Sequence, residues 1–252
     1  MTAELAAIGV VIPARDEAAR LDRCLAAVTA SVAALRRTRA GAALGIRVVV
    51  VADACTDRTT DVLTRWPGVG TVISDAGRVG AARAAGVHQV FTSLTADGIS
   101  PHTTWIANTD ADSAVPPGWL ATHAAAAGRG AALLLGTVRP DSHELDRVVE
   151  RRWYRRHRLA DGHTHVHGAN LGVRADWYRV AGGFPPVARD EDVALATAVL
   201  AAGGTVERTG ESPVLTSARL AGRAPGGMAG YLRRLREVPD DLPDETAEPC
   251  SA

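Results

Sequence analysis

Two uninterrupted apolar stretches, each followed by a helical pattern, most constrain the fold of this chain. The first runs from Ile8 to Ile12 and ends at Pro13, and the second runs from Val48 to Val51. Strands with one solvated face alternate apolar and polar residues, whereas continuous apolar runs are typical of strands buried on both faces. The sequence therefore predicts an α/β fold with a mostly parallel sheet and helices on both of its faces.

The rest of the chain continues this alternation of strands and helices. We expect further strands at 71–73, 104–108, 132–138 and 205–217, and helices at about 21–35, 56–66, 80–87, 119–126, 143–159, 175–182 and 191–202. A length of 252 residues suits one large α/β domain. We expect this domain over 1–238. The segment 239–252 is acidic, rich in proline and poor in large apolar side chains, which predicts a disordered tail.

Charge and cysteine content narrow the class of protein. The 28 basic and 28 acidic residues give a formal net charge of zero, which gives no indication of nucleic acid or an anionic membrane as a partner. The sequence contains no apolar run of membrane-spanning length, and its first residues lack the basic segment of a signal peptide. The three cysteines are odd in number and far apart. We therefore expect a cytoplasmic protein with no transmembrane segment.

Acidic residues follow three of the predicted strands. Asp16 and Glu17 come after the first strand, Asp53 after the second, and Asp110 and Asp112 after the fourth. The carboxyl ends of the strands form the ligand crevice of an open α/β sheet. The sequence therefore predicts that these side chains lie along one edge of the sheet.

Asp110 and Asp112 have no basic residue beside them in the sequence. An aspartate after a strand is often only a turn former or a helix cap. Alternatively, two carboxylates this close repel each other, and a hard divalent cation that bridges to substrate phosphates relieves the repulsion. On that interpretation the missing counter-charge is a metal ion and the ligand is phosphorylated.

The run Asp190-Glu191-Asp192 opens a predicted helix. Acidic residues in a first helical turn ordinarily interact with the helix dipole. A carboxylate that faces an apolar cleft would instead have a raised pKa and could take a proton from a hydroxyl. The sequence leaves both interpretations open.

Histidines and arginines form two further groups. His163, His165 and His167 alternate, so they would share one face of an extended segment; a metal site is one interpretation and a polar loop is the other. The arginines between Arg151 and Arg158 are more typical of a solvated helix face than of a site for an anionic acceptor.

Glycine-rich stretches hold other candidates. Gly80 and Arg83 lie in a helical stretch where glycine is unfavourable, which indicates close approach of a ligand or of another backbone. Arg219 and Arg223 lie near the carboxyl end, and because guanidinium groups match phosphate geometry they could close over a diphosphate.

Seven short motifs occur in an order that resembles the family 2 glycosyltransferases of GT-A fold. They span about residues 8–230 and read VVIPARDEAARLDRCLAAV, VVVVADACTDRT, GRVGAARAAG, WIANTDADSAVPPGWL, GANLGVRADWYRVAGGF, DEDVALA and TSARLAGR. Each motif is short, but their joint occurrence by chance is improbable. The resemblance implies the nucleotide-diphospho-sugar transferase fold, with a nucleotide-binding half at about 1–117 and an acceptor half at about 118–238.

The resemblance also implies a donor site. Its nucleotide-sugar contacts would be Pro13, Ala14, Arg15, Glu17, Asp53, Gly80, Arg83, Asp110, Ala111 and Asp112. Asp110 is expected near the ribose, and Asp112 on a metal, Mn²⁺ or Mg²⁺, that bridges the diphosphate. Ala52, Ala54 and Cys55 depart from the family's turn around Asp53. The donor is therefore left as a UDP-sugar, which is favoured, or a GDP-sugar.

The chemistry implied by the resemblance is transfer of a sugar, a hexose by preference, to an acceptor hydroxyl with inversion. Asp192, preceded by Glu191, matches the family's Glu-Asp pair, in which the aspartate is expected to deprotonate the acceptor. Expected on the acceptor or diphosphate side are Gly168, Ala169, Asn170, Arg219 and Arg223. The alternatives are a retaining GT-A enzyme and a catalytically inactive nucleotide-sugar-binding protein.

Overall fold

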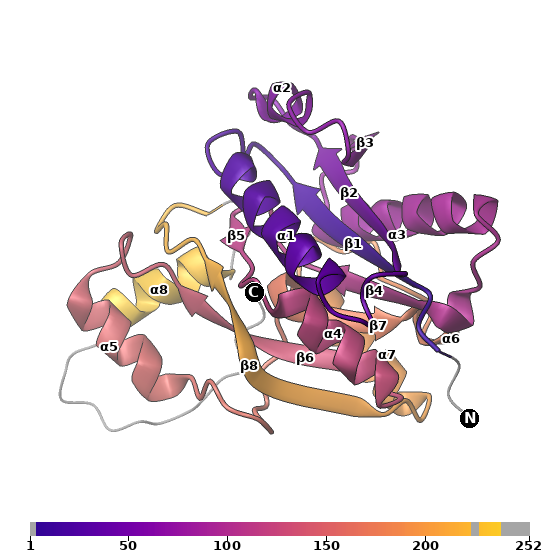
Figure 1. Ribbon diagram of the computed structural model, residues 1–252. Helices are drawn as coiled ribbons and strands as arrows, with labels where there is room; N and C mark the ends of the chain where they lie inside the picture. Colours follow the sequence, from indigo (N-terminus) through magenta and orange to yellow (C-terminus); the bar gives the residue numbers. More distant parts are fainter. Residues whose placement is uncertain (1–3, 223–226, 238–252) are drawn as a thin grey trace.

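The computed structural model describes residues 4–222 and 227–237. Its sheet has the strand order β3-β2-β1-β4-β7-β6-β8-β5 (Figure 1). The strands are β1 Ala7–Ala14, β2 Gly45–Asp53, β3 Gly70–Ser74, β4 Thr104–Asn108, β5 Ser113–Ala114, β6 Leu133–Pro140, β7 Leu171–Arg174 and β8 Val206–Thr216. The pairs β3-β2, β2-β1, β1-β4 and β6-β8 are parallel, whereas β7 runs antiparallel to β4 and β6, and β5 to β8. The predicted α/β fold with a mostly parallel sheet is confirmed.

Helices cover both faces of this sheet. The helices are α1 Leu21–Arg36, α2 Thr59–Leu63, α3 Val79–Ala96, α4 Trp119–Gly128, α5 Arg147–Arg156, α6 Ala175–Val180, α7 Glu191–Ala201 and α8 Met228–Glu237, with 3₁₀ turns η1 Pro101–Thr103 and η2 Gly168–Asn170. Along β1, Ile8, Val10 and Ile12 pack in one core with α1 and α4. Ala7 and Val11 face the other way, into a core with α3, α6 and α7. Because β1 is apolar on both sides, its run is continuous, as the sequence predicts.

The helices α5 and α8, which are far apart in the sequence, pack together beside the sheet (Figure 1). Val149 and Trp153 of α5 pack against Leu232 and Leu235 of α8 in a third core. The helix predicted over 143–159 is shorter, because the side chain of Asp146 caps its start and the chain turns extended at its end. The sequence prediction did not include α8. The helix expected at 56–66 is reduced to α2.

The parallel strands β2, β1 and β4 are neighbours and end together. Asp53 at the end of β2, and the turns that carry Glu17, Asp110 and Asp112, therefore lie at one edge of the sheet, as predicted. The predicted acidic tail and Arg223 lie outside the described residues. In the described part of the chain, no helix has both the length and the apolar composition needed to cross a bilayer.

Candidate functional site

Arg83 on α3 links two motifs that are far apart in the sequence. Its Nη2 lies 2.6 Å from Oδ1 of Asp110, and its Nε donates to Oε1 of Glu191 at 2.9 Å. Arg83 and Glu191 are both buried. A Cβ added at Gly168 would come within 2.4 Å of Arg83 Nη2, so the absence of a side chain there makes room for the guanidinium. Within the described residues, Nη1 of Arg83 has no hydrogen-bond partner.

Asp192 lies in the first turn of α7, and its side chain is completely buried. One carboxylate oxygen, Oδ1, accepts the backbone N–H of Val193 at 2.8 Å. The other, Oδ2, has no hydrogen bond that meets the distance and angle limits among the residues that the structure describes. The backbone N–H of Gly168 is close enough to the carboxylate to lower its pKa. Burial, and then the charge of Glu191, raise the pKa of Asp192 to about 7, although Arg83 opposes this shift. Asp192 can therefore exchange a proton near neutral pH.

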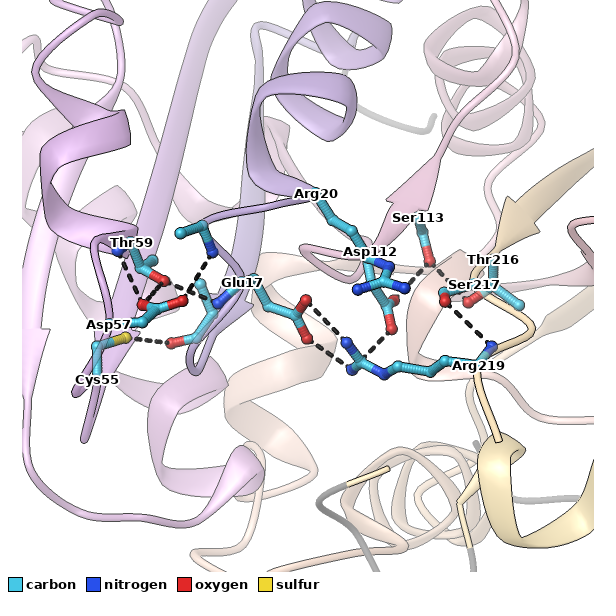
Figure 2. Close-up of polar contacts among 12 residues, drawn as sticks. Glu17, Arg20, Cys55, Asp57, Thr59, Asp112, Ser113, Thr216, Ser217 and Arg219 are labelled. Atoms are coloured by element: carbon cyan, nitrogen blue, oxygen red, sulfur yellow. Dashed lines mark hydrogen bonds and ion pairs between the residues drawn. The ribbon is translucent and has the colours of Figure 1, made fainter. Parts of the chain in front are cut away.

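Arg219 provides the counter-charge for Asp112. Figure 2 shows its guanidinium between two carboxylates, with Nη1 and Nη2 donating to Oε2 and Oε1 of Glu17 at 2.9 and 2.6 Å. The same Nη2 lies 3.0 Å from Oδ2 of Asp112. Asp110 and Asp112, which have no basic neighbour in the sequence, thus each have a guanidinium partner in the structure. The side chains of Arg83 and Arg219 reach them from distant parts of the sequence. The metal ion at Asp112 stays a prediction.

Glu144 holds the segment that carries Arg219. One of its carboxylate oxygens, Oε2, accepts the hydroxyl of Ser217 at 2.6 Å and the backbone N–H of Ala218 at 2.9 Å. The turn after Asp112 is tied to the same strand end, because Ser113 donates to the hydroxyl of Thr216 at 3.0 Å (Figure 2). The sequence analysis did not single out Glu144, because no motif marks a residue whose role depends on a contact with a remote segment.

The predicted donor-side residues surround the ends of β1 and β2. Oδ1 of Asp53 accepts the hydroxyl of Ser74 at 2.7 Å and the backbone N–H of Gly77 at 3.1 Å. Arg15 reaches the carbonyl of Gly77 at 3.4 Å. Asp16 adopts a positive φ of 49° and accepts the backbone N–H of Thr56 at 2.6 Å. Asp16 thus fixes the turn after β2 against the turn after β1.

Other donor-side candidates have backbone or packing contacts. Pro13 and Ala14 end β1, and the carbonyl of Ala14 accepts the thiol of Cys55 at 3.4 Å. Ala111 is buried in the core with α1. At Gly80, an added Cβ would lie 2.0 Å from the carbonyl oxygen of Pro185. The close approach that glycine indicates here is therefore to another backbone segment.

The predicted acceptor-side residues of η2 are buried. Asn170 uses its whole amide: Oδ1 accepts the indole N–H of Trp119 at 2.9 Å, and Nδ2 donates to the carbonyls of Thr137 and Ser212 at 2.8 and 2.9 Å. Ala169 lies in the core beside α1 and α4. In the structure Asn170 therefore connects β6 with β8 and α4, and η2 brings Gly168 to Arg83.

Four buried histidine rings stack next to η2. Ring centroids are 5.9 Å apart for His163 and His165, 5.7 Å for His165 and His167, and 5.0 Å for His157 and His165. Burial, and then the neighbouring histidines, lower the pKa of His167 to about 3, which keeps it neutral. No three His, Cys, Asp or Glu side chains of the described part of the chain are arranged to hold a metal ion. The alternative of a three-histidine zinc site is therefore not supported.

The charges around Asp112 fit a divalent cation shared with a phosphorylated ligand. Carboxylates of Glu17, Asp110, Asp112 and Glu191 outnumber the guanidinium groups of Arg83 and Arg219 that pair with them. Carboxylate oxygens are hard ligands, and Mg²⁺ or Mn²⁺ needs only one or two of them when water and phosphate oxygens complete its coordination.

Comparison with known protein families decides the classification. The model of glycosyl transferase family 2 matches residues 9–179, which is more than half of the chain. The chain belongs to glycosyltransferase family 2. The matched segment includes Asp53, Arg83, Asp110 and Asp112, whereas Asp192 and Arg219 lie beyond it. Among curated proteins, none matches the sequence.

The fold of this chain is similar to that of solved GT-A glycosyltransferase structures. S. aureus TarS 1-349 in complex with UDP superposes with a TM-score of 0.57 at 14% identity, over 84% of this chain and 60% of that one. Mannosyltransferase PcManGT from Pyrobaculum calidifontis, with GDP-Man and Mn²⁺, gives 0.56 at 20% identity, over 86% and 57%. GalNAc-T7 with UDP, GalNAc and Mn²⁺ gives 0.60 at 15% identity, over 94% and 48%. This chain thus spans only about half to three fifths of those proteins.

Proposed function

We propose that this protein transfers a sugar from a nucleoside-diphosphate sugar to an acceptor hydroxyl with inversion, and that Asp192 is the general base. The observation that carries the proposal is the buried Asp192, whose Oδ2 has no hydrogen bond that meets the distance and angle limits among the described residues and whose pKa is about 7. A base with a pKa near the working pH combines a useful deprotonated fraction with a useful affinity for the proton.

The reaction follows from where the charges lie. Oδ2 of Asp192 takes the proton of the acceptor hydroxyl. The oxygen of that hydroxyl attacks the anomeric carbon of the donor sugar, and the bond between this carbon and the diphosphate breaks. Arg83 and Arg219 are placed to interact with charge on the departing nucleoside diphosphate, because each lies beside a carboxylate of the turn that follows β4. Asp112 is the residue we assign to hold Mn²⁺ or Mg²⁺, which when bound neutralises negative charge on the diphosphate.

The acceptor has to reach a side chain that is buried in the structure. The segment before α7 covers this region: the carbonyl of Val187 accepts the backbone N–H of Gly80 at 3.1 Å, and the Phe184 ring lies beside Arg83. Both Val187 and Arg189 are exposed, so this segment lies at the surface. We infer that movement of residues 184–190 admits the acceptor to Asp192.

The donor is a UDP-sugar by preference, with a GDP-sugar as the alternative. The neighbouring structures support a nucleotide-sugar donor in general, since they hold UDP, UDP-GlcNAc or GDP-Man. Inversion is tested by the proton NMR coupling constant of the anomeric hydrogen in the product, which separates it from the retaining alternative.

Substitution of Asp192 tests the proposed base. With water as the acceptor, Asp192→Asn is expected to slow release of nucleoside diphosphate from the donor by about 10²- to 10⁴-fold, because a positioned base contributes about that much. Nucleotide affinity, measured by calorimetry, should stay unchanged. Asp190→Asn is the matched control, because Asp190 is exposed and its left-handed backbone, with a φ of 61°, is one that asparagine also adopts. Equal rates in both variants would remove Asp192 from the base role.

A further inference from the structure

We propose that Arg219 is the resident counter-ion of Glu17 and Asp112, and that a divalent cation binds there only by displacing it, so that metal and donor enter the site together. The inference rests on the proposed function, because it assumes a nucleoside-diphosphate donor. It adds two roles to that function. Glu17 becomes a second ligand for the metal, and Arg219 becomes the group that couples the metal to the donor.

The contacts of Arg219 show that it is the counter-ion of both carboxylates. Its guanidinium has a two-pronged contact with Glu17 and a third contact with Asp112, so a single cation already occupies the space between the two carboxylates (Figure 2). The Glu17 side chain is only 6% exposed and that of Asp112 17%, so both carboxylates gain from a close positive charge.

The two carboxylates are also a suitable donor set for Mn²⁺ or Mg²⁺ once Arg219 has left. Both supply hard oxygen ligands from turns that are fixed independently of Arg219. The backbone N–H of Glu17 donates to the hydroxyl of Thr59 at 2.8 Å, and Ser113 is fixed to Thr216. The position of the oxygens therefore does not depend on the arginine.

Arg219 can leave because its backbone is held separately from its side chain. Glu144 binds the backbone N–H of Ala218 and the hydroxyl of Ser217, whereas the Arg219 side chain is partly exposed. A diphosphate offers the guanidinium an alternative two-pronged partner beside Glu17 and Asp112. Arg219 thus exchanges the two carboxylates for the diphosphate in a single movement.

This exchange predicts a reciprocal coupling. The donor removes Arg219 from Glu17 and Asp112 and so strengthens metal binding, and by linkage the metal strengthens donor binding by the same factor. Without nucleotide the cation has to compete with Arg219, so the free protein should bind Mn²⁺ weakly.

Mn²⁺ titrations followed by electron paramagnetic resonance, without nucleotide, test this competition directly. We expect Arg219→Gln to bind Mn²⁺ about tenfold more tightly than the wild type, or more, within the usual range of coupling between sites. Arg219→Lys, which keeps a cation, should remain closer to the wild type. The double variant Glu17→Gln/Arg219→Gln should lose the gain, since one of the two ligands is then neutral.

Arg20→Gln is the matched control. Arg20 contributes a positive charge near Asp112 and pairs with Glu144 at 3.5 Å. Its loss changes the local charge by the same amount but leaves Arg219 in place, so only a small change in Mn²⁺ affinity is expected. Circular dichroism of each variant verifies that it is folded.

Three outcomes would overturn the inference: Mn²⁺ affinity unchanged or weakened in Arg219→Gln, an equal gain in Arg20→Gln, or a gain that persists in the double variant. A different result would contradict the proposed function: the wild type would bind neither UDP nor GDP, whether or not Mn²⁺ is present. Calorimetry with the two nucleotides, carried out in parallel, separates the two failures.

Discussion

Three consecutive acidic residues at the start of α7 have three different environments. Asp190 is exposed, Glu191 is buried against Arg83, and Asp192 is buried with one oxygen that has no hydrogen bond within the distance and angle limits among the described residues. The sequence shows an acidic first turn, for which a dipole interaction and a catalytic role are equally good interpretations. Only the packing of α7 against α3 separates them, because it determines which carboxylate meets the guanidinium.

The environment of Asp192 predicts how the rate depends on pH. Because the pKa is raised to about 7 and the base acts in its deprotonated form, nucleoside diphosphate release should fall about tenfold for each pH unit below 7 and level off above it. Rates measured between pH 5 and 9 at saturating metal test this. The residual activity of Asp192→Asn should lack this acidic limb, and a wild-type profile that is flat across pH 7 would contradict the assignment.

The pair Asp110 and Asp112 shows what a sequence motif can and cannot predict about a single residue. The spacing and the position after a strand identify both residues as candidates, and the structure places them in a charged site. The sequence also identified Arg83 and Arg219 as candidates, but it did not predict that they pair with these carboxylates, because Arg83 comes from α3 and Arg219 from beyond β8. A counter-charge that lies far away in the sequence leaves no local pattern.

At the scale of elements, the strands that position the site were predictable and the peripheral helices were not. Continuous apolar runs predicted β1 and β2, and β4 was predicted over its observed range, 104–108. In contrast, α8 is short, follows a glycine-rich segment and buries Leu232 and Leu235 in a small core shared with α5 and Ala218. Such a helix is stabilised by a tertiary partner that the sequence does not reveal.

The contact between α3 and the segment before α7 gives a prediction at this scale. Gly80→Ala should lower the free energy of unfolding by about 1–3 kcal/mol, because its Cβ would lie 2.0 Å from the carbonyl oxygen of Pro185 and backbone has to shift. Gly128→Ala is the matched control, since that helical glycine has nothing within 4 Å of an added Cβ. It should be neutral or stabilising by up to about 1 kcal/mol. Urea denaturation measures both, and equal stabilities would show that the close approach at Gly80 is not needed.

At the scale of the whole molecule, ion pairs join the two halves that the sequence predicts. Arg83 and Glu17 come from the first half, and their partners Glu191 and Arg219 come from the second. The net charge of zero gives no sign of these local ion pairs or of the arginines on the packed helices α5 and α8. Total charge therefore gave no indication of a nucleic-acid or membrane partner, and it could not locate the site.

Release of nucleoside diphosphate from a panel of UDP- and GDP-sugars tests the central claim most directly. The wild type with Mn²⁺ is expected to release one of the two nucleotides from at least one donor, to stop when EDTA is added and to recover with excess Mn²⁺. Asp192→Asn should bind the same nucleotide without comparable release. If no donor in the panel is turned over and neither nucleotide binds, the protein is not the nucleotide-sugar transferase proposed.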